Sequence, residues 1–227
     1  MKKKFLLMSL LTVGLLTFSA CGKADLDLSK YVIEQRENLF TASDNMYSVS
    51  FSTGRRECEY NFDGIVNEMV PFGVLTLTRN DNQPLANDSY TYVVKINEES
   101  YTGFLQKNNT NNSYSADLEV NTTGDELINV QISFTGYTFN QDLTNTSSEF
   151  NVDSNTALSI ATNELKDNIN DLLRDNTSIE VVMKIMKDHS SVELKNYYWY
   201  VGIISTDGDT LGVLIDATSG EIIAKKV

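Results

Sequence analysis

The sequence contains few of the residues on which catalytic and nucleic-acid-binding sites are commonly built. Its 227 residues include one histidine and two cysteines. It has 18 Lys and Arg residues and 31 Asp and Glu residues, which gives a net charge of −13. This balance repels phosphates and argues against nucleic acid as a partner. The patterns Gly-x-Ser-x-Gly and His-Glu-x-x-His are absent, so we predict no enzyme, no metal and no cofactor. The single histidine, His189, is interpreted as an exposed loop residue.

Long hydrophobic runs are also missing after the first twenty residues. Residues 2–4 are lysines, an apolar run extends from Phe5 to Leu16, and the small residues Ser19 and Ala20 precede Cys21. This order is typical of a signal peptide, and the apolar run is shorter than the roughly 20 residues that cross a bilayer. We therefore predict a signal peptide over residues 1–20 and a mature chain that does not cross the membrane.

The segment Phe18-Ser19-Ala20-Cys21 resembles the lipobox of bacterial lipoproteins, although an aliphatic residue is usual in place of Phe18. The resemblance implies cleavage between Ala20 and Cys21 and acylation of the Cys21 thiol by diacylglycerol, with chains such as palmitate. Such an anchor would hold the protein on the cell membrane, facing the extracellular or envelope side. The alternative is an ordinary secretory signal cut near Ala20, with Cys21 unmodified.

Lipidation of Cys21 would leave Cys58 without a partner for an intramolecular disulfide. Cys58 alternates with Tyr60 and Phe62, which predicts a strand whose apolar side carries the thiol. A buried, unreactive cysteine is expected there, because the two flanking glutamates would disfavour a reactive thiolate.

Hydrophobic spacing divides the chain after the signal peptide into three parts. Residues 21–45 are interpreted as a lipidated tether followed by a short helix, with Ser29 as its N-cap and Phe40 near its end. Residues 46–150 alternate with a period of two and carry frequent turn residues, which predicts an antiparallel β-sandwich of immunoglobulin-like type. Gly136 falls where the alternation changes phase and predicts a β-bulge.

Residues 151–227 show a helical period first and strands afterwards. Asp153 or Ser154 is expected to cap a helix whose apolar stripe comprises Leu158, Ala161, Leu165, Ile169 and Leu172. The strands follow, with Asp207-Gly208 as a hairpin turn. The predicted fold class is therefore α+β, an antiparallel sandwich followed by a small domain of one helix packed on a three- to four-stranded antiparallel sheet.

The order of parts in residues 154–227 resembles the PepSY domain. The parts are a helix with Ala157 and Ala161, an aromatic strand, a hairpin and a closing turn Asp216-Ala217-Thr218-Ser219-Gly220-Glu221, with Ser219 where Thr is usual. PepSY domains occur in propeptides of secreted metalloproteases and in envelope proteins, and they are thought to restrain peptidases. The resemblance implies a regulatory domain without catalytic residues of its own.

The aromatic strand supplies the candidate partner-binding residues. Tyr197, Tyr198, Trp199 and Tyr200 are consecutive, so alternate rings face opposite sides of a sheet and one pair is expected to face outward. Exposed rings of this kind suit peptide or glycan binding, and the alternative is packing within the fold. The predicted function is that of a non-enzymatic envelope lipoprotein that binds or regulates a protein or peptide, such as a secreted or surface peptidase. A surface hydrolase of glycans or peptides, and an adhesive or structural module, are the alternatives.

Overall fold

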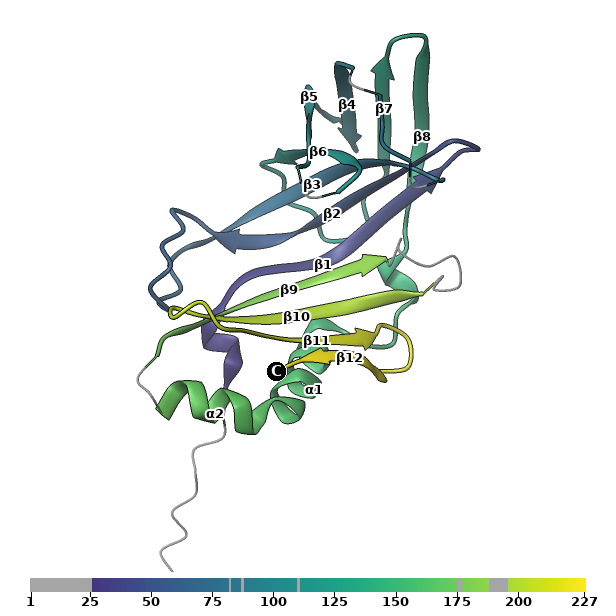
Figure 1. Ribbon diagram of the computed structural model, residues 1–227. Helices are drawn as coiled ribbons and strands as arrows, with labels where there is room; N and C mark the ends of the chain where they lie inside the picture. Colours follow the sequence, from purple (N-terminus) through teal and green to yellow (C-terminus); the bar gives the residue numbers. More distant parts are fainter. Residues whose placement is uncertain (1–25, 82, 87, 110, 175–176, 188–195) are drawn as a thin grey trace, which may run out of the picture.

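The structure is a computed structural model that describes residues 26–227 except residues 82, 87, 110, 175–176 and 188–195 (Figure 1). The predicted signal peptide with Ala20, the predicted lipid-attachment residue Cys21, and His189 lie outside the described residues. The described residues form twelve strands and two short α-helices. The strands are β1 Val32–Ser43, β2 Tyr47–Glu57, β3 Met69–Arg79, β4 Tyr90–Ile96, β5 Glu99–Lys107, β6 Ser113–Leu118, β7 Ile128–Phe134, β8 Tyr137–Asn145, β9 Ile179–Lys187, β10 Tyr197–Ser205, β11 Thr210–Asp216 and β12 Ile222–Lys226.

The first eight strands close into an antiparallel barrel with the order β1-β2-β3-β6-β5-β4-β7-β8-β1. Closure depends on two narrow seams. β1 meets β8 through the pairs Phe40↔Asn145 and Thr41↔Thr144, and β5 meets β6 through only two pairs. Apolar side chains from alternate positions point inward and fill the interior, as the period of two requires. They include Phe40, Phe51, Leu75, Val94, Val130, Ile132 and Phe139, each at most 1% exposed.

β1 belongs to the barrel and also to a second run of strands. Before a register shift between Arg36 and Asn38, β1 pairs in parallel with β9, and after the shift it reaches β8. The sheet then continues antiparallel through β9, β10, β11 and β12, so the barrel and the C-terminal strands share one hydrogen-bonded sheet (Figure 1). The irregularity in β1 is therefore the point at which the two parts diverge.

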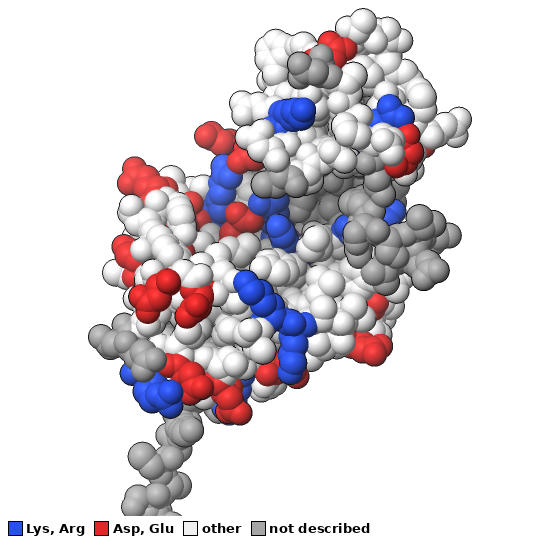
Figure 2. All heavy atoms as spheres, in the orientation of Figure 1, with Lys and Arg blue, Asp and Glu red and all other residues white. Residues whose placement is uncertain are grey.

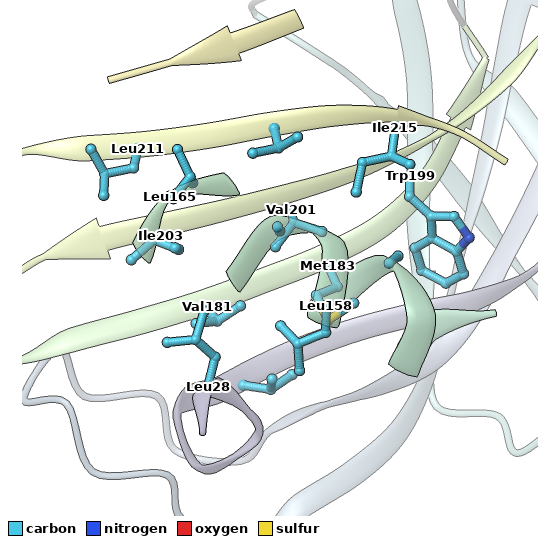
Figure 3. Close-up of a cluster of buried hydrophobic side chains, with 14 of the residues drawn as sticks. Leu28, Leu158, Leu165, Val181, Met183, Trp199, Val201, Ile203, Leu211 and Ile215 are labelled. Atoms are coloured by element: carbon cyan, nitrogen blue, oxygen red, sulfur yellow. The ribbon is translucent and has the colours of Figure 1, made fainter. Parts of the chain in front are cut away.

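Two helices cover one face of β9, β10 and β11. They are α1 Ser154–Glu164 and α2 Lys166–Arg174, and Asp153 caps α1 by accepting a hydrogen bond from the Thr156 N–H. Leu158 and Leu165 belong to one buried cluster with side chains of the sheet that include Val181, Met183 and Ile203 (Figure 3). The predicted helical stripe is confirmed, since Leu158, Ala161, Leu165 and Ile169 are buried and Leu172 packs beside them.

The predicted helix from Ser29 to Phe40 is wrong. The chain makes a single 3-10 turn, η1 Leu28–Tyr31, capped by Asp27, and then enters β1. Pairing with other strands overrides the weak helical pattern, because β1 forms a hairpin with β2 and also pairs with β8 and β9, which lie more than a hundred residues along the chain. The spacing within residues 29–40 carries no information about these partners.

The predicted fold class is also wrong. Alternation correctly indicated antiparallel strands, but the sheets do not form an immunoglobulin-like sandwich, because the two seams join them into a closed cycle. The last four strands do not form a sheet of their own, because β9 is hydrogen-bonded to β1. Two short helices replace the single predicted helix. The predicted division at residues 46–150 and 151–227 stays a prediction.

Several turns can be compared with their sequence signals. Gly208, with φ 92°, occupies the hairpin between β10 and β11, as predicted. Gly136 lies in the hairpin between β7 and β8, so the predicted bulge at this position is wrong.

Cys58 follows the end of β2 and is exposed, so the expectation of a buried thiol within a strand is wrong. No helix among the described residues is long and apolar enough to cross a membrane.

Candidate functional site

The four aromatic residues of β10 lie in different environments. Trp199 and Tyr198 are each 1% exposed, on opposite faces of the sheet. The Trp199 indole belongs to the core beneath the helices and donates to the Val152 carbonyl over 2.8 Å. Burial therefore takes two of the four candidate binding residues out of contact with solvent.

The two remaining rings are half-buried and each lies beside a lysine. Tyr197 stacks on Phe150 at 5.3 Å, and the Lys187 Nζ lies 5.9 Å from the centre of its ring. Tyr200 is on the other face, where the Lys184 Nζ lies 5.6 Å from its ring. Both lysines are the direct cross-strand neighbours of their tyrosines on β9.

Tyr200 rests on a part of the sheet that has no side chains. A Cβ at Gly202 would meet the Tyr200 phenol at 2.6 Å, and a Cβ at Gly212 would lie 3.4 Å from the same ring. The ring therefore covers the backbone of β10 and β11. Glycine at these two positions is what allows the aromatic side chain to lie close to the sheet.

We use the name open face for the side of β9, β10 and β11 opposite the helices. Alternation places on it six side chains that are neither fully buried nor fully exposed: Val182, Lys184, Tyr200, Ile204, Thr210 and Leu214. Four of the six are apolar or aromatic. Tyr198, Glu180 and Asp216 on the same face are buried, so the half-exposed apolar side chains occupy its middle. A cluster of such side chains at the surface is typical of a binding surface.

Two arginines continue the open face onto the barrel. The guanidinium of Arg36 lies 2.7 Å from Glu34, and that of Arg56 lies 2.6 Å from Asp117. Both guanidinium groups also stack over the ring of Phe72, at 5.3 and 4.5 Å from its centre. Figure 2 shows Lys and Arg side chains gathered at mid-height of the molecule, with Asp and Glu side chains around them.

Lys184 is the cation of this group that has no ion-pair partner among the described residues. Among the described residues, no carboxylate or other acceptor lies within hydrogen-bonding or ion-pair distance of its ammonium group. Burial and the Arg36 charge lower the pKa of Lys184, while Glu34 raises it. The protein therefore holds an incompletely solvated positive charge beside an aromatic ring and aliphatic side chains.

A loop borders the end of the open face near the start of β9. It connects β2 to β3 and exposes Tyr60, Phe62 and Ile65 at 53%, 40% and 62% of their surfaces. Glu180 fixes this loop from within the sheet, because its buried carboxylate accepts from the Tyr60 O–H over 2.9 Å and from the Gly64 N–H over 3.2 Å. The exposed aromatic residues of the loop extend the apolar surface.

Two hollows lie elsewhere on the molecule. A groove of about 330 Å³ runs between η1 and α1, and a cleft of about 300 Å³ lies where the barrel meets the start of α1. Glu37, Asp125 and Asp153 line the cleft. Hydrogen bonds from Thr156 hold the pKa of Asp153 below its ordinary value, the reverse of what a general acid needs at neutral pH. In the part of the chain that the structure describes, no group of three or more His, Cys, Asp or Glu side chains could hold a metal ion.

Sequence reasoning did not find Lys184, Arg36 or Arg56. The three side chains come from β9, β1 and β2, and only the parallel pairing of β1 with β9 brings them onto one surface. A usable signal was present in β9, where Lys184 interrupts a strand that is otherwise mostly apolar. Comparison of the chain with protein-family models, with curated proteins and with solved structures found no match. The PepSY and immunoglobulin-like resemblances are wrong because the first eight strands close into a barrel and β9 continues the same sheet through β1.

Proposed function

We propose that this chain is a non-enzymatic lipoprotein of the cell envelope that binds a protein or peptide partner on its open face. The anchor would be the acylated thiol of Cys21, as the lipobox-like segment implies. The observation that carries the binding role is the Lys184 ammonium group, which lies among Val182, Tyr200 and Leu214 without a neutralising carboxylate among the described residues.

The position of the tether supports this arrangement. Leu26 packs against the core that α1 and α2 cover. These helices lie at the end of the molecule opposite the barrel strands β4, β5, β7 and β8 (Figure 1). Four residues separate Cys21 from Leu26, and an extended chain covers about 3.5 Å per residue. A lipid on Cys21 would therefore keep the helices near the bilayer and direct the barrel away from it.

The partner class follows from the type of surface. Aromatic and aliphatic side chains at half exposure give contact area at low entropic cost, and one unneutralised cation orients a polar group of the partner. The resemblance that pointed to a peptidase is wrong, so we propose a protein or peptide partner without naming its activity.

Site-specific photo-crosslinking in intact cells tests the proposal. A photoreactive amino acid at Ile204 on the open face should give a discrete adduct with a protein, and Lys184→Glu should abolish it. The same amino acid at Gln131, exposed on the barrel strand β7, is the matched control and should give no such adduct. Equal adducts at both positions, or none at Ile204, would refute binding at the open face. Mass spectrometry that finds Cys21 unmodified would refute the anchor.

A further inference from the structure

The charges around Lys184 restrict what the open face can bind. Arg36 and Arg56 each have a carboxylate partner at 2.7 and 2.6 Å, so Glu34 and Asp117 already neutralise both of them. Lys184 adds one positive charge beyond those two pairs. A ligand with a single negative charge can be neutralised at this site, whereas a polyanion would meet Glu34, Asp117 and the repulsion of a chain with net charge −13.

The side chains that flank Lys184 are apolar in both directions. Val182 and Met186 lie two residues before and after it on the same face of β9, and Met186 is 37% exposed. Tyr200 on β10 is the cross-strand neighbour of Lys184, and Leu214 on β11 is the cross-strand neighbour of Tyr200. Apolar groups therefore lie on three sides of the ammonium group.

The spacing along β9 matches that of an extended peptide. Residues two apart on a strand are separated by about 6.8 Å and point to the same side. A peptide lying along β9 with the pattern apolar-x-acidic-x-apolar would place its carboxylate at Lys184 and its apolar side chains at Val182 and Met186.

We propose that the ligand of the open face is an extended peptide segment that bears one carboxylate flanked at two-residue spacing by apolar side chains. This inference rests on the proposed function and adds the chemistry of the partner. Lys184 binds the carboxylate, and the surrounding aliphatic and aromatic side chains contact the flanking apolar residues. The hydrogen bond from the partly desolvated Lys184 ammonium group to the peptide carboxylate is charge-assisted. It therefore favours a peptide with a glutamate or aspartate over the same peptide with the corresponding amide.

Chemical-shift titration of the purified full chain with two blocked pentapeptides tests the inference. The peptides are Leu-Thr-Glu-Thr-Leu and the isosteric Leu-Thr-Gln-Thr-Leu, whose ends are acetylated and amidated so that the glutamate carries the only charge. We expect the acidic peptide to bind about tenfold more tightly, as expected for a hydrogen bond between charged groups. The shifts should concentrate on β9, β10 and β11.

Two variants isolate the ammonium group. Lys184→Met keeps an unbranched side chain over Tyr200 and should remove the tenfold preference. Lys187→Met removes the other lysine that lies over a cross-strand tyrosine and should leave the preference intact, because that pair is on the opposite face.

Each contrary result has a defined meaning. Equal affinity for the two peptides, a preference that survives Lys184→Met, binding of neither peptide, or stronger competition by inorganic polyphosphate at physiological salt would overturn the acidic-peptide assignment. An Ile204 adduct that is lost in Lys184→Glu but persists in Lys184→Met would overturn the same assignment while leaving the proposed binding function in place.

Discussion

Tyr60 donates its phenolic hydrogen to the fully buried carboxylate of Glu180 over 2.9 Å, and this bond connects the loop between β2 and β3 to the first residues of β9. The bond links a loop of the barrel to the C-terminal strands at a second point besides the pairing of β1 with β9. It also holds the exposed ring of Tyr60 at the border of the open face.

Removing this phenol should destabilise the protein measurably. Tyr60→Phe leaves one oxygen of a buried carboxylate without its donor, which costs about 1–3 kcal/mol in the free energy of unfolding by urea. Tyr101→Phe is the control, because it breaks a phenol–carboxylate bond to Glu99 that is exposed, and it should cost less than about 0.5 kcal/mol. Equal losses in the two variants would show that the Tyr60 bond has no special structural role.

The same bond predicts sensitivity to alkaline pH. Burial, together with the hydrogen bond and charge of Glu180, raises the pKa of Tyr60 from 10.0 to about 12. A raised pKa in the folded state means that the protonated phenol stabilises the fold; this contribution is complete below pH 10 and is lost as the pH rises to 12. Urea unfolding followed across this range should show a steeper fall for the natural chain than for Tyr60→Phe. Parallel curves would contradict the assignment.

The turn between β11 and β12 should be sensitive to acid. Asp216 accepts from the N–H groups of Ser219 and Thr218 at 2.8 and 2.9 Å, and these bonds lower its pKa from 3.8. Its contribution is therefore present above pH 3.8 and is lost as the pH falls through the lower folded value. At neutral pH we expect Asp216→Ala to cost about 2 kcal/mol by urea unfolding. The exposed Asp209 offers a matched control, and an equal cost for Asp209→Ala would contradict the prediction.

Two glycines on neighbouring parts of the sheet should respond differently to alanine. A Cβ at Gly54 would lie 1.9 Å from the Gln35 carbonyl oxygen, which is backbone of β1 and cannot move without disturbing the sheet. We expect Gly54→Ala to cost about 3 kcal/mol in thermal or urea unfolding. Gly202→Ala meets the flexible end of Tyr200 instead, so it should cost about 1 kcal/mol or less and displace the ring. A cost for Gly202→Ala that equals or exceeds that for Gly54→Ala would contradict this assignment.

The shared sheet predicts that the molecule unfolds as one unit. Trp199 is the single tryptophan and reports on the core beneath the helices, whereas far-ultraviolet circular dichroism reports on all strands. The two signals should have coincident urea midpoints. Val130→Ala in the barrel core should lower both midpoints, with a loss of about 2 kcal/mol. An unchanged Trp199 transition in that variant would mean that the barrel and the C-terminal strands unfold separately.

The sequence by itself determined the elements whose stabilising contacts are local. The α1 cap at Asp153, the stripe from Leu158 to Ile169 and the hairpin at Gly208 depend on residues a few positions apart, so spacing and turn chemistry were sufficient to predict them. Alternation of apolar residues likewise predicted the strands of the barrel, and in β7 the alternate residues Ile128, Val130 and Ile132 are buried. Alternation did not predict burial in β10, where the adjacent Tyr198 and Trp199 are both buried.

Only the tertiary structure decided how these elements associate. The closure of the barrel depends on two residue pairs between β1 and β8. Residues 32–43 form a strand that pairs with the adjacent β2 and also with β8 and β9, more than a hundred residues away. The open face has the same origin, because Lys184 and Arg36 come together through the parallel pairing of β9 with β1. Two distant strands pair when each has a free hydrogen-bonding edge and an apolar face that the other can bury. Whether they do depends on the rest of the chain, so the sequence of one strand alone does not predict its partners.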